Sequence, residues 1–156
     1  MIRILFLCTG NICRSPLADG FARHRIKTLG LDWSIDSAGT GDWHVGETPD
    51  PRAMVVAAQR GYSIGDLRAR QLEPSDYFEF NHIVALERSH LEFLTRHQPA
   101  GATSKNTLLL DWASMDHDSV ADPYYDDDTA FALVADEIET GVNALIDALS
   151  ERPDMI

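Results

Sequence analysis

Cysteine, basic side chains and long apolar runs are all scarce in this chain of 156 residues. Its only thiols, Cys8 and Cys13, lie in one short segment, which leaves no cysteine for a framework of structural disulfides. No apolar run approaches the roughly 20 residues of a membrane-spanning helix, and the segment from Met1 to Cys8 is too short for a secretory leader. We therefore expect a cytoplasmic protein whose thiols stay reduced and which has no membrane partner.

The charge balance is strongly acidic, with 25 acidic against 13 basic side chains and a net charge of −12. A surface of this sign repels nucleic acids and anionic lipids, so neither is expected as a partner. It also attracts acidic phosphopeptides poorly, unless Arg52, Arg68 or Arg70 lies near the binding site. Hydrophobic residues make up 44% of the chain, as in an ordinary globular protein. Because internal repeats and linkers are lacking, we expect one domain over residues 1–156.

Strand-like and helix-like segments alternate along the chain, which is typical of a parallel sheet built from right-handed crossovers. The predicted strands are residues 2–7, 33–37, 82–86 and 107–110. The predicted helices are residues 14–29, ending at Gly30, and residues 50–60, 90–96 and 129–149. The sequence therefore predicts an α/β, doubly wound (Rossmann-like) three-layer fold around a central four-stranded parallel sheet. Residues 111–128 are expected to form a long, irregular, Asp-rich loop.

The spacing of side chains indicates which side of each helix faces the core. The last helix carries an apolar stripe at three- and four-residue steps, formed by Phe131, Val134, Ile138, Val142, Leu145 and Leu149. In the first helix the spacing selects Leu17, Phe21, His24 and Thr28. In the second it selects Ala53, Met54, Ala57 and Ala58.

The most informative segment joins the first strand to the first helix and reads Leu5-Phe6-Leu7-Cys8-Thr9-Gly10-Asn11-Ile12-Cys13-Arg14-Ser15-Pro16. Its turn can gather backbone N–H groups into a concavity that binds an oxyanion, and the start of the helix adds its positive end. The Arg14 guanidinium matches two phosphate oxygens, and the same positive field favours the thiolate form of Cys8. A cysteine at a strand end is most often a small buried side chain. Here its context favours a phosphate site with a thiolate nucleophile.

This segment resembles the signature loop of the low-molecular-weight protein tyrosine phosphatases. Further segments follow the pattern of that family in the same order: Ser37-Ala38-Gly39-Thr40, Trp43-His44-Val45-Gly46, Pro49-Asp50-Pro51-Arg52-Ala53, Ala69-Arg70-Gln71-Leu72 and Asp122-Pro123-Tyr124-Tyr125. The resemblance covers nearly the whole chain. It implies a phosphotyrosine protein phosphatase that needs no metal or cofactor and that forms a cysteinyl-phosphate intermediate.

The resemblance also implies a role for individual residues. Cys8 is the expected nucleophile, Arg14 the phosphate clamp and Asp122 the general acid and base, although Asp122 alone would read as a solvated loop charge. The rest of the loop, Thr9, Gly10, Asn11, Ile12, Cys13 and Ser15, is expected to bind the phosphate.

Residues around the loop have expected roles of their own. The hydroxyl of Ser15 can donate to the Cys8 thiolate, and Asn11 tolerates a left-handed backbone and can bond neighbouring groups. By resemblance, Ser37 supports this network, and Trp43 and Tyr124 form the walls of a slot for a phosphorylated ring. The family also uses the thiol that matches Cys13 to trap the oxidised nucleophile as a disulfide.

The chain departs from the family's usual pattern in three places. Leu67 stands where a histidine often supports the loop asparagine, and Asp126 stands where a glycine usually follows the tyrosines. After the third strand the chain reads Leu86-Glu87-Arg88-Ser89-His90 instead of Met-Asp-x-x-Asn. These changes bear on the rate and the rigidity of the loop rather than on the reacting groups.

Other functions fit this sequence less well. A metal site at His90 and His97, or at Asp116-His117-Asp118, lacks a third fixed ligand, so these are interpreted as surface groups. Arsenate reduction needs further cysteines, and none follows Cys13. Phosphoarginine phosphatases of this fold carry a smaller polar residue at the position of Ile12. A non-catalytic phosphotyrosine-binding module needs neither a thiolate nor a proton donor. The oligomeric state stays open.

Overall fold

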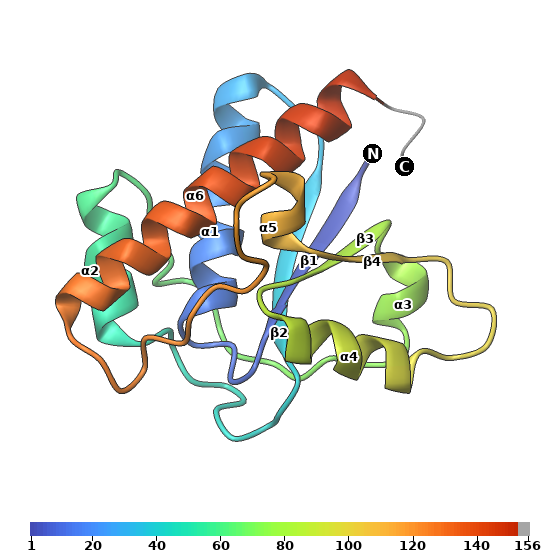
Figure 1. Ribbon diagram of the computed structural model, residues 1–156, viewed down its shortest axis with the longest axis horizontal. Coiled ribbons are helices and arrows are strands. Elements are labelled where there is room, and N and C mark those ends of the chain that lie inside the picture. Colours follow the sequence, from blue (N-terminus) through green and yellow to red (C-terminus); the bar gives the residue numbers. More distant parts are fainter. Residues whose placement is uncertain (153–156) are drawn as a thin grey trace.

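The structure of the chain is a computed structural model that describes residues 1–152. Its elements, in chain order, are β1 (Arg3–Cys8), α1 (Arg14–Leu29), β2 (Ser34–Gly39), α2 (Pro51–Gln59), α3 (Asp76–Glu79), β3 (His82–Ala85), α4 (Arg88–His97), β4 (Lys105–Leu108), α5 (Leu109–Trp112) and α6 (Asp128–Glu151). Figure 1 shows α6 lying across the sheet on the same side as α1 and α5.

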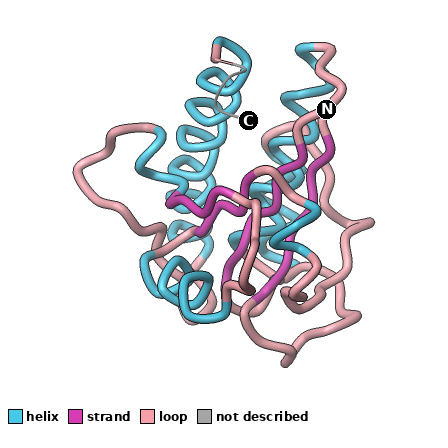
Figure 2. Tube along the Cα trace, turned by 90° about the vertical axis from the view of Figure 1, so that its right-hand side faces the viewer, coloured by secondary structure: helices cyan, strands magenta, loops and turns pink. Residues whose placement is uncertain are grey.

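The four strands form one parallel sheet in the order β2-β1-β3-β4. Side chains of β1 alternate between its two faces, so Ile4 and Phe6 pack with α1, α5 and α6 while Leu5 and Leu7 pack with α3 and α4. Figure 2 shows helices on both sides of the twisted sheet. The fold is therefore the predicted doubly wound α/β architecture, with a sheet between two helical layers.

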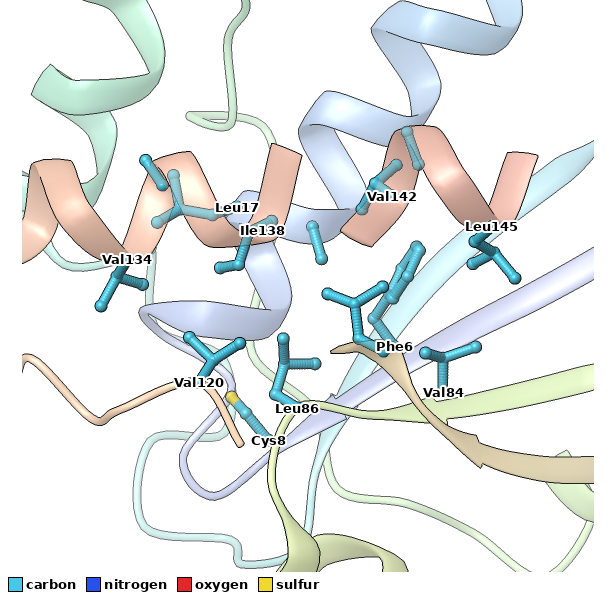
Figure 3. Close-up of a cluster of buried hydrophobic side chains, with 14 of the residues drawn as sticks. Phe6, Cys8, Leu17, Val84, Leu86, Val120, Val134, Ile138, Val142 and Leu145 are labelled. Atoms are coloured by element: carbon cyan, nitrogen blue, oxygen red, sulfur yellow. The ribbon is translucent and has the colours of Figure 1, made fainter. Parts of the chain in front are cut away.

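The larger of the two cores lies between the sheet and α6. The six apolar side chains predicted to line α6 are all buried there, with exposed fractions of 4% or less. Figure 3 shows the cluster, in which Cys8 lies at one edge, near Leu86 and Val120. The hydrophobic layer thus ends where the loop after β1 begins.

Some sequence predictions need correction. The fourth strand is Lys105–Leu108 rather than residues 107–110, because Leu109 and Leu110 begin the short helix α5. The helix α3 was not predicted. The side chains of His24, Thr28 and Ala58 are exposed rather than turned to the core, since Asp19, Gly20, Ala22 and Ile26 form the buried side of α1 instead. Gly30 ends α1, as predicted, and it adopts a left-handed conformation.

The chain leaves β1 for β2 on one side and returns to β3 on the other, so strand order reverses beside the carboxyl end of β1. In open α/β sheets this switch point is where ligands bind. Cys8 is the last residue of β1 and therefore lies at that point. Among residues 1–152, no helix is long and apolar enough to cross a membrane.

Candidate active site

The β1–α1 loop, residues 9–13, turns sharply between Cys8 and the first turn of α1. Asn11 adopts a left-handed backbone with a φ of 58°, a conformation that lets successive N–H groups converge on an anion. The loop also lies against the end of β2: a Cβ on Gly39 would come within 2.6 Å of the Thr9 carbonyl oxygen. Only glycine permits this approach, so Gly39 contributes to the position of the loop.

A neutral network lies on the nucleophile side of the loop. Cys8 Sγ is 2.9 Å from Ser15 Oγ, and the Asn11 side-chain amide donates to Ser15 Oγ at 2.8 Å and to Ser37 Oγ at 3.0 Å. All four side chains are buried. Since Ser15 Oγ already accepts from Asn11, its own hydrogen can point to sulfur, and a Cys8 thiolate makes Ser15 the necessary donor. This is the arrangement expected from the sequence.

The histidine that Leu67 replaces is not needed to satisfy Asn11. The backbone N–H of Arg70 donates to Asn11 Oδ1 at 3.0 Å. The Arg70 guanidinium is itself held by Asp36 at 3.0 Å and by Asp76 at 3.0 and 3.1 Å. A paired arginine thus fixes the backbone that bonds to the loop asparagine, while Leu67 packs against the apolar core.

A charged network lies on the other side of the loop, around Arg14, which is only 2% exposed. One nitrogen of its guanidinium, NH1, donates to Glu87 Oε1 at 3.0 Å and to the Val120 carbonyl at 2.9 Å. The other, NH2, lies 3.4 Å from Thr9 Oγ1 and 3.7 Å from Asp122 Oδ2. Glu87, a departure from the usual family residue, therefore pairs directly with the predicted phosphate clamp.

His90 completes this charged side. Its Nε2 lies 2.9 Å from Thr9 Oγ1 and 3.1 Å from Glu87 Oε1. Burial, with the charge of Arg14, lowers the pKa of His90 to about 3, so the ring is neutral at working pH. We assign its single proton to Nε2, because a carboxylate can only accept. The interpretation of His90 as a surface group was wrong: it is 2% exposed and contacts the β1–α1 loop.

A pocket of about 380 Å³ opens over the loop. Its lining combines most of the predicted site residues with two others: Cys8, Thr9, Gly10, Ile12, Cys13, Arg14, Trp43, His44, Asp122, Tyr124 and Tyr125. Asn11, Ser15 and Ser37 are not part of this lining and support the loop from behind. The segments that carry these residues are far apart in sequence, and the sheet brings them to one edge.

The mouth of the pocket is aromatic. Trp43 is 70% exposed and Tyr125 93% exposed, so neither is a core residue. The rings of Tyr124 and Tyr125 are in edge contact with centroids 4.9 Å apart. Asp122 is half-exposed beside them, and its Oδ1 accepts from the Tyr124 N–H at 3.1 Å. The pocket thus offers a thiol, a guanidinium and a carboxyl group beside aromatic walls.

Cys13 is a free, buried thiol at the start of α1. Burial, and secondarily the charge of Asp50, raises the pKa of this thiol, so it stays protonated at neutral pH. Its proposed pairing with an oxidised Cys8 stays a prediction. No group of three or more His, Cys, Asp or Glu side chains suited to a metal ion occurs within residues 1–152.

Several contacts at the site were not foreseen. His44 packs beside Gly10 and faces Tyr124, and it could have been suspected from its place next to Trp43. Of the three arginines considered for the rim, Arg52 and Arg70 are paired with carboxylates, whereas Arg68 bonds only to carbonyls. Arg52 pairs with Asp50, Arg70 pairs with Asp36 and Asp76, and Arg68 donates to the carbonyls of Gly65 and Leu67.

Comparison with known proteins agrees with this geometry. The model of the family described as low molecular weight phosphotyrosine protein phosphatase matches residues 3–154. The chain belongs to this family. A low molecular weight phosphotyrosine protein phosphatase of Schizosaccharomyces pombe is 41% identical over 128 residues, covering 80% of this chain and 81% of the relative. A low molecular weight protein-tyrosine-phosphatase of Streptomyces coelicolor is 39% identical over 156 residues, covering 96% of this chain and 94% of the relative.

The fold of the family is shared as well. The crystal structure of a protein tyrosine phosphatase from Entamoeba histolytica, with Hepes in its active site, superposes with a TM-score of 0.91. It is 32% identical, and the match covers 97% of this chain and 98% of that one. Members of this family are hydrolases, and the positions of Cys8 and Arg14 on the β1–α1 loop are consistent with a cysteinyl-phosphate mechanism.

Proposed function

We propose that this phosphatase hydrolyses phosphotyrosine in proteins, with Cys8 as nucleophile, Arg14 as phosphate clamp and Asp122 as general acid and base. The observation that carries the proposal is the lining of one pocket by all three side chains. In the first step, the Cys8 thiolate attacks phosphorus in line. The bond from phosphorus to the tyrosine oxygen breaks, and Asp122 gives its proton to the departing phenolate.

The second step releases the enzyme. Asp122, now a carboxylate, takes a proton from a water molecule that attacks the cysteinyl phosphate. The sulfur–phosphorus bond breaks, and inorganic phosphate and the Cys8 thiolate are formed. Donation from Ser15, 2.9 Å away, stabilises the sulfur as it leaves. Arg14 and the loop N–H groups bind the phosphate oxygens in both steps.

Two features support a preference for phosphotyrosine. Trp43 and Tyr124 stand at the mouth of the pocket, where a flat ring gains roughly 0.5–1.5 kcal/mol from each aromatic contact. A phosphoserine side chain is too short to reach the loop past these walls. Ile12 keeps the lining apolar where phosphoarginine phosphatases carry a polar residue. We place the activity in the reducing cytoplasm, where a thiolate nucleophile survives, in a single domain.

The direct test is hydrolysis of p-nitrophenyl phosphate and of phosphotyrosine, phosphoserine and phosphoarginine peptides. We expect activity on the first two, inhibition by vanadate and no effect of chelators. Cys8→Ser is expected to abolish turnover while a phosphotyrosine peptide still binds, since Arg14 and the loop remain. Substantial activity in a clean Cys8→Ser preparation contradicts the mechanism, and equal rates on phosphoarginine contradict the substrate.

Asp122 can be tested by the choice of leaving group. Removing a general acid typically costs about 10²–10⁴ in rate, and the cost is largest where the leaving oxygen is most basic. Asp122→Asn is therefore expected to slow hydrolysis of phenyl phosphate more than that of p-nitrophenyl phosphate, measured as kcat. Equal losses on both substrates indicate a positional role instead.

A further inference from the structure

A second depression adjoins the phosphate pocket. This side groove, with a volume of about 500 Å³, is lined mainly by His44, Glu47, Thr48, Pro49 and Asp50. It shares three lining residues with the pocket, namely Ile12, His44 and Tyr124. The two cavities are therefore neighbours across one wall, and a peptide whose phosphotyrosine enters the pocket can extend over the groove.

The groove carries one carboxylate without a cationic partner from lysine or arginine. Asp50 is not available, because Arg52 donates to both its oxygens and the Asp50 side chain is only 9% exposed. Glu47 is 60% exposed, and its hydrogen-bond partner is the His44 ring. Its backbone is fixed, since the Glu47 N–H bonds to the His44 carbonyl and the Glu47 carbonyl accepts from Ala69. The acidic group is thus held in place but open to a ligand.

Apart from the His44 ring, no basic side chain of the groove lining competes for that carboxylate. Its lining contains no lysine or arginine, and Arg52, which contacts the lining residues Asp50 and Tyr124, is paired with the Asp50 carboxylate. The mouth of the pocket adds exposed aromatic faces at Trp43 and Tyr125, which also attract cations. A cationic side chain of the substrate can therefore contact both a carboxylate and an aromatic surface beside the pocket, whereas an acidic side chain is repelled by Glu47.

We infer that the side groove is a substrate subsite that selects a lysine or arginine within about two residues of the phosphotyrosine, with Glu47 as its anchor. The inference rests on the proposed function, because it assumes phosphotyrosine in the pocket. The distance in sequence follows from the shared wall, since neighbouring Cα atoms are 3.8 Å apart. An arginine in the substrate is expected to bind more strongly than a lysine, because its planar guanidinium both stacks on aromatic rings and pairs with a carboxylate.

The test uses phosphotyrosine peptides that differ at one position. Alanine, lysine, arginine or glutamate is placed in turn at each position from −2 to +2, and kcat/KM is measured at low ionic strength. Exposed ion pairs contribute about 0.2–1 kcal/mol, so we expect a basic residue to raise kcat/KM roughly 1.4- to 5-fold over alanine at one or two positions. The preference is expected to fade in high salt. Hydrolysis of p-nitrophenyl phosphate and of the all-alanine peptide reports separately on the proposed function.

Variants at Glu47 separate the groove from the general acidity of the protein. Glu47→Gln keeps the shape and is expected to bring the lysine-to-alanine ratio close to one, and Glu47→Lys to reverse the order of the lysine and glutamate peptides. Asp147→Asn is the matched control: it removes an exposed carboxylate on α6 and is expected to keep the ratio. An unchanged ratio in Glu47→Gln, or an equal fall in Asp147→Asn, overturns the subsite while leaving the phosphatase activity intact.

Discussion

The two sides of the β1–α1 loop are both buried, yet they are built from different chemistry. On the nucleophile side, Cys8 is held by hydroxyl and amide groups from Ser15, Asn11 and Ser37. On the arginine side, Arg14 is held by the carboxylate of Glu87 and by a carbonyl. The loop thus separates a neutral support from a charged one by only a few residues.

This difference follows from what each side must hold. The Cys8 sulfur is an anion before attack and again when it leaves, but it is uncharged while bound to phosphorus. Neutral donors can accommodate both forms, whereas a fixed positive charge would favour the anion. Arg14 is cationic throughout, and a buried cation without a partner is very costly. Of the departures from the family's usual pattern, Glu87 and His90 fall on the charged side, whereas Leu67 falls beside the neutral side, where the Arg70 N–H bonds to Asn11 instead. The neutral side keeps its usual hydroxyl and amide groups.

The largest effect is expected from Arg14→Lys. Lysine keeps the charge, but its compact ammonium group lacks the planar set of N–H donors of a guanidinium. It therefore cannot bond to Glu87, the Val120 carbonyl and two phosphate oxygens at the same time. By analogy with the loss of one oxyanion donor, kcat/KM on p-nitrophenyl phosphate is expected to fall about 10²–10³-fold. Vanadate inhibition is expected to weaken in parallel, since this side binds the anion. An unchanged vanadate Ki contradicts that assignment.

Ser15→Ala tests the neutral side. Hydrogen bonds to charged groups contribute about 1.5–3 kcal/mol, so loss of the donor to Cys8 is expected to lower kcat roughly 10- to 100-fold. Breakdown of the cysteinyl phosphate should slow most, which a pre-steady-state burst of p-nitrophenol would reveal. Vanadate binding is expected to change much less than in Arg14→Lys. If the two variants weaken vanadate equally, the two sides do not act separately.

Low pH is expected to destabilise the fold through His90, on the charged side of the β1–α1 loop, more than through the neutral side. His90 binds a proton near pH 6.5 when unfolded but only near pH 3 when folded, so the unfolded state takes up more protons between these values. Stability is therefore complete above pH 6.5 and falls as the pH drops below it. We expect His90→Asn to lose less unfolding free energy than the wild type between pH 7 and pH 5, by on the order of 1–2 kcal/mol. Urea unfolding at both pH values measures this, and equal losses contradict it.

The smallest effect concerns the hydrogen bonds of His90. His90→Leu removes the donor to Thr9 and Glu87, and the vanadate Ki is expected to rise about fivefold, as for one hydrogen bond of about 1 kcal/mol. His90→Asn keeps an N–H donor and is expected to restore the Ki to within about twofold. A merely space-filling role predicts the reverse, because leucine fills the apolar surroundings of the ring at least as well as asparagine.

Local patterns predicted most of the fold correctly. Three predictions rest on residues that are close in sequence: the apolar stripe of α6, the end of α1 at Gly30 and the alternation of strands and helices. All three are confirmed. The boundary between β4 and α5 was wrong because Thr107 to Leu110 is a short apolar run, and such runs do not distinguish strand from helix. The prediction that His24 faces the core was wrong. The buried side of α1 includes small residues such as Gly20 and Ala22, which do not form a clear apolar stripe in the sequence.

The site likewise contains residues that sequence motifs predict and contacts that they do not predict. The β1–α1 loop and the segment of Asp122 carry recognisable motifs, and the pocket brings them together as expected. The contacts of Glu87 and His90 could not be predicted, because they join residues more than 70 positions apart in sequence. The pairing of Arg70 with Asp36 is another contact between distant segments, and no local sequence pattern predicts it.

The bond from Arg14 to the Val120 carbonyl has a mechanical consequence. Val120 is fully buried, and its N–H bonds to the Leu86 carbonyl at 2.8 Å. Asp122 follows only two residues later, within about 7 Å of chain. The segment that carries Asp122 is therefore anchored at Val120 by the Arg14 guanidinium, the group that we propose binds the phosphate. We therefore expect Asp122 to stay at the pocket, so that in the proposed mechanism the proton donor is in position before the substrate binds.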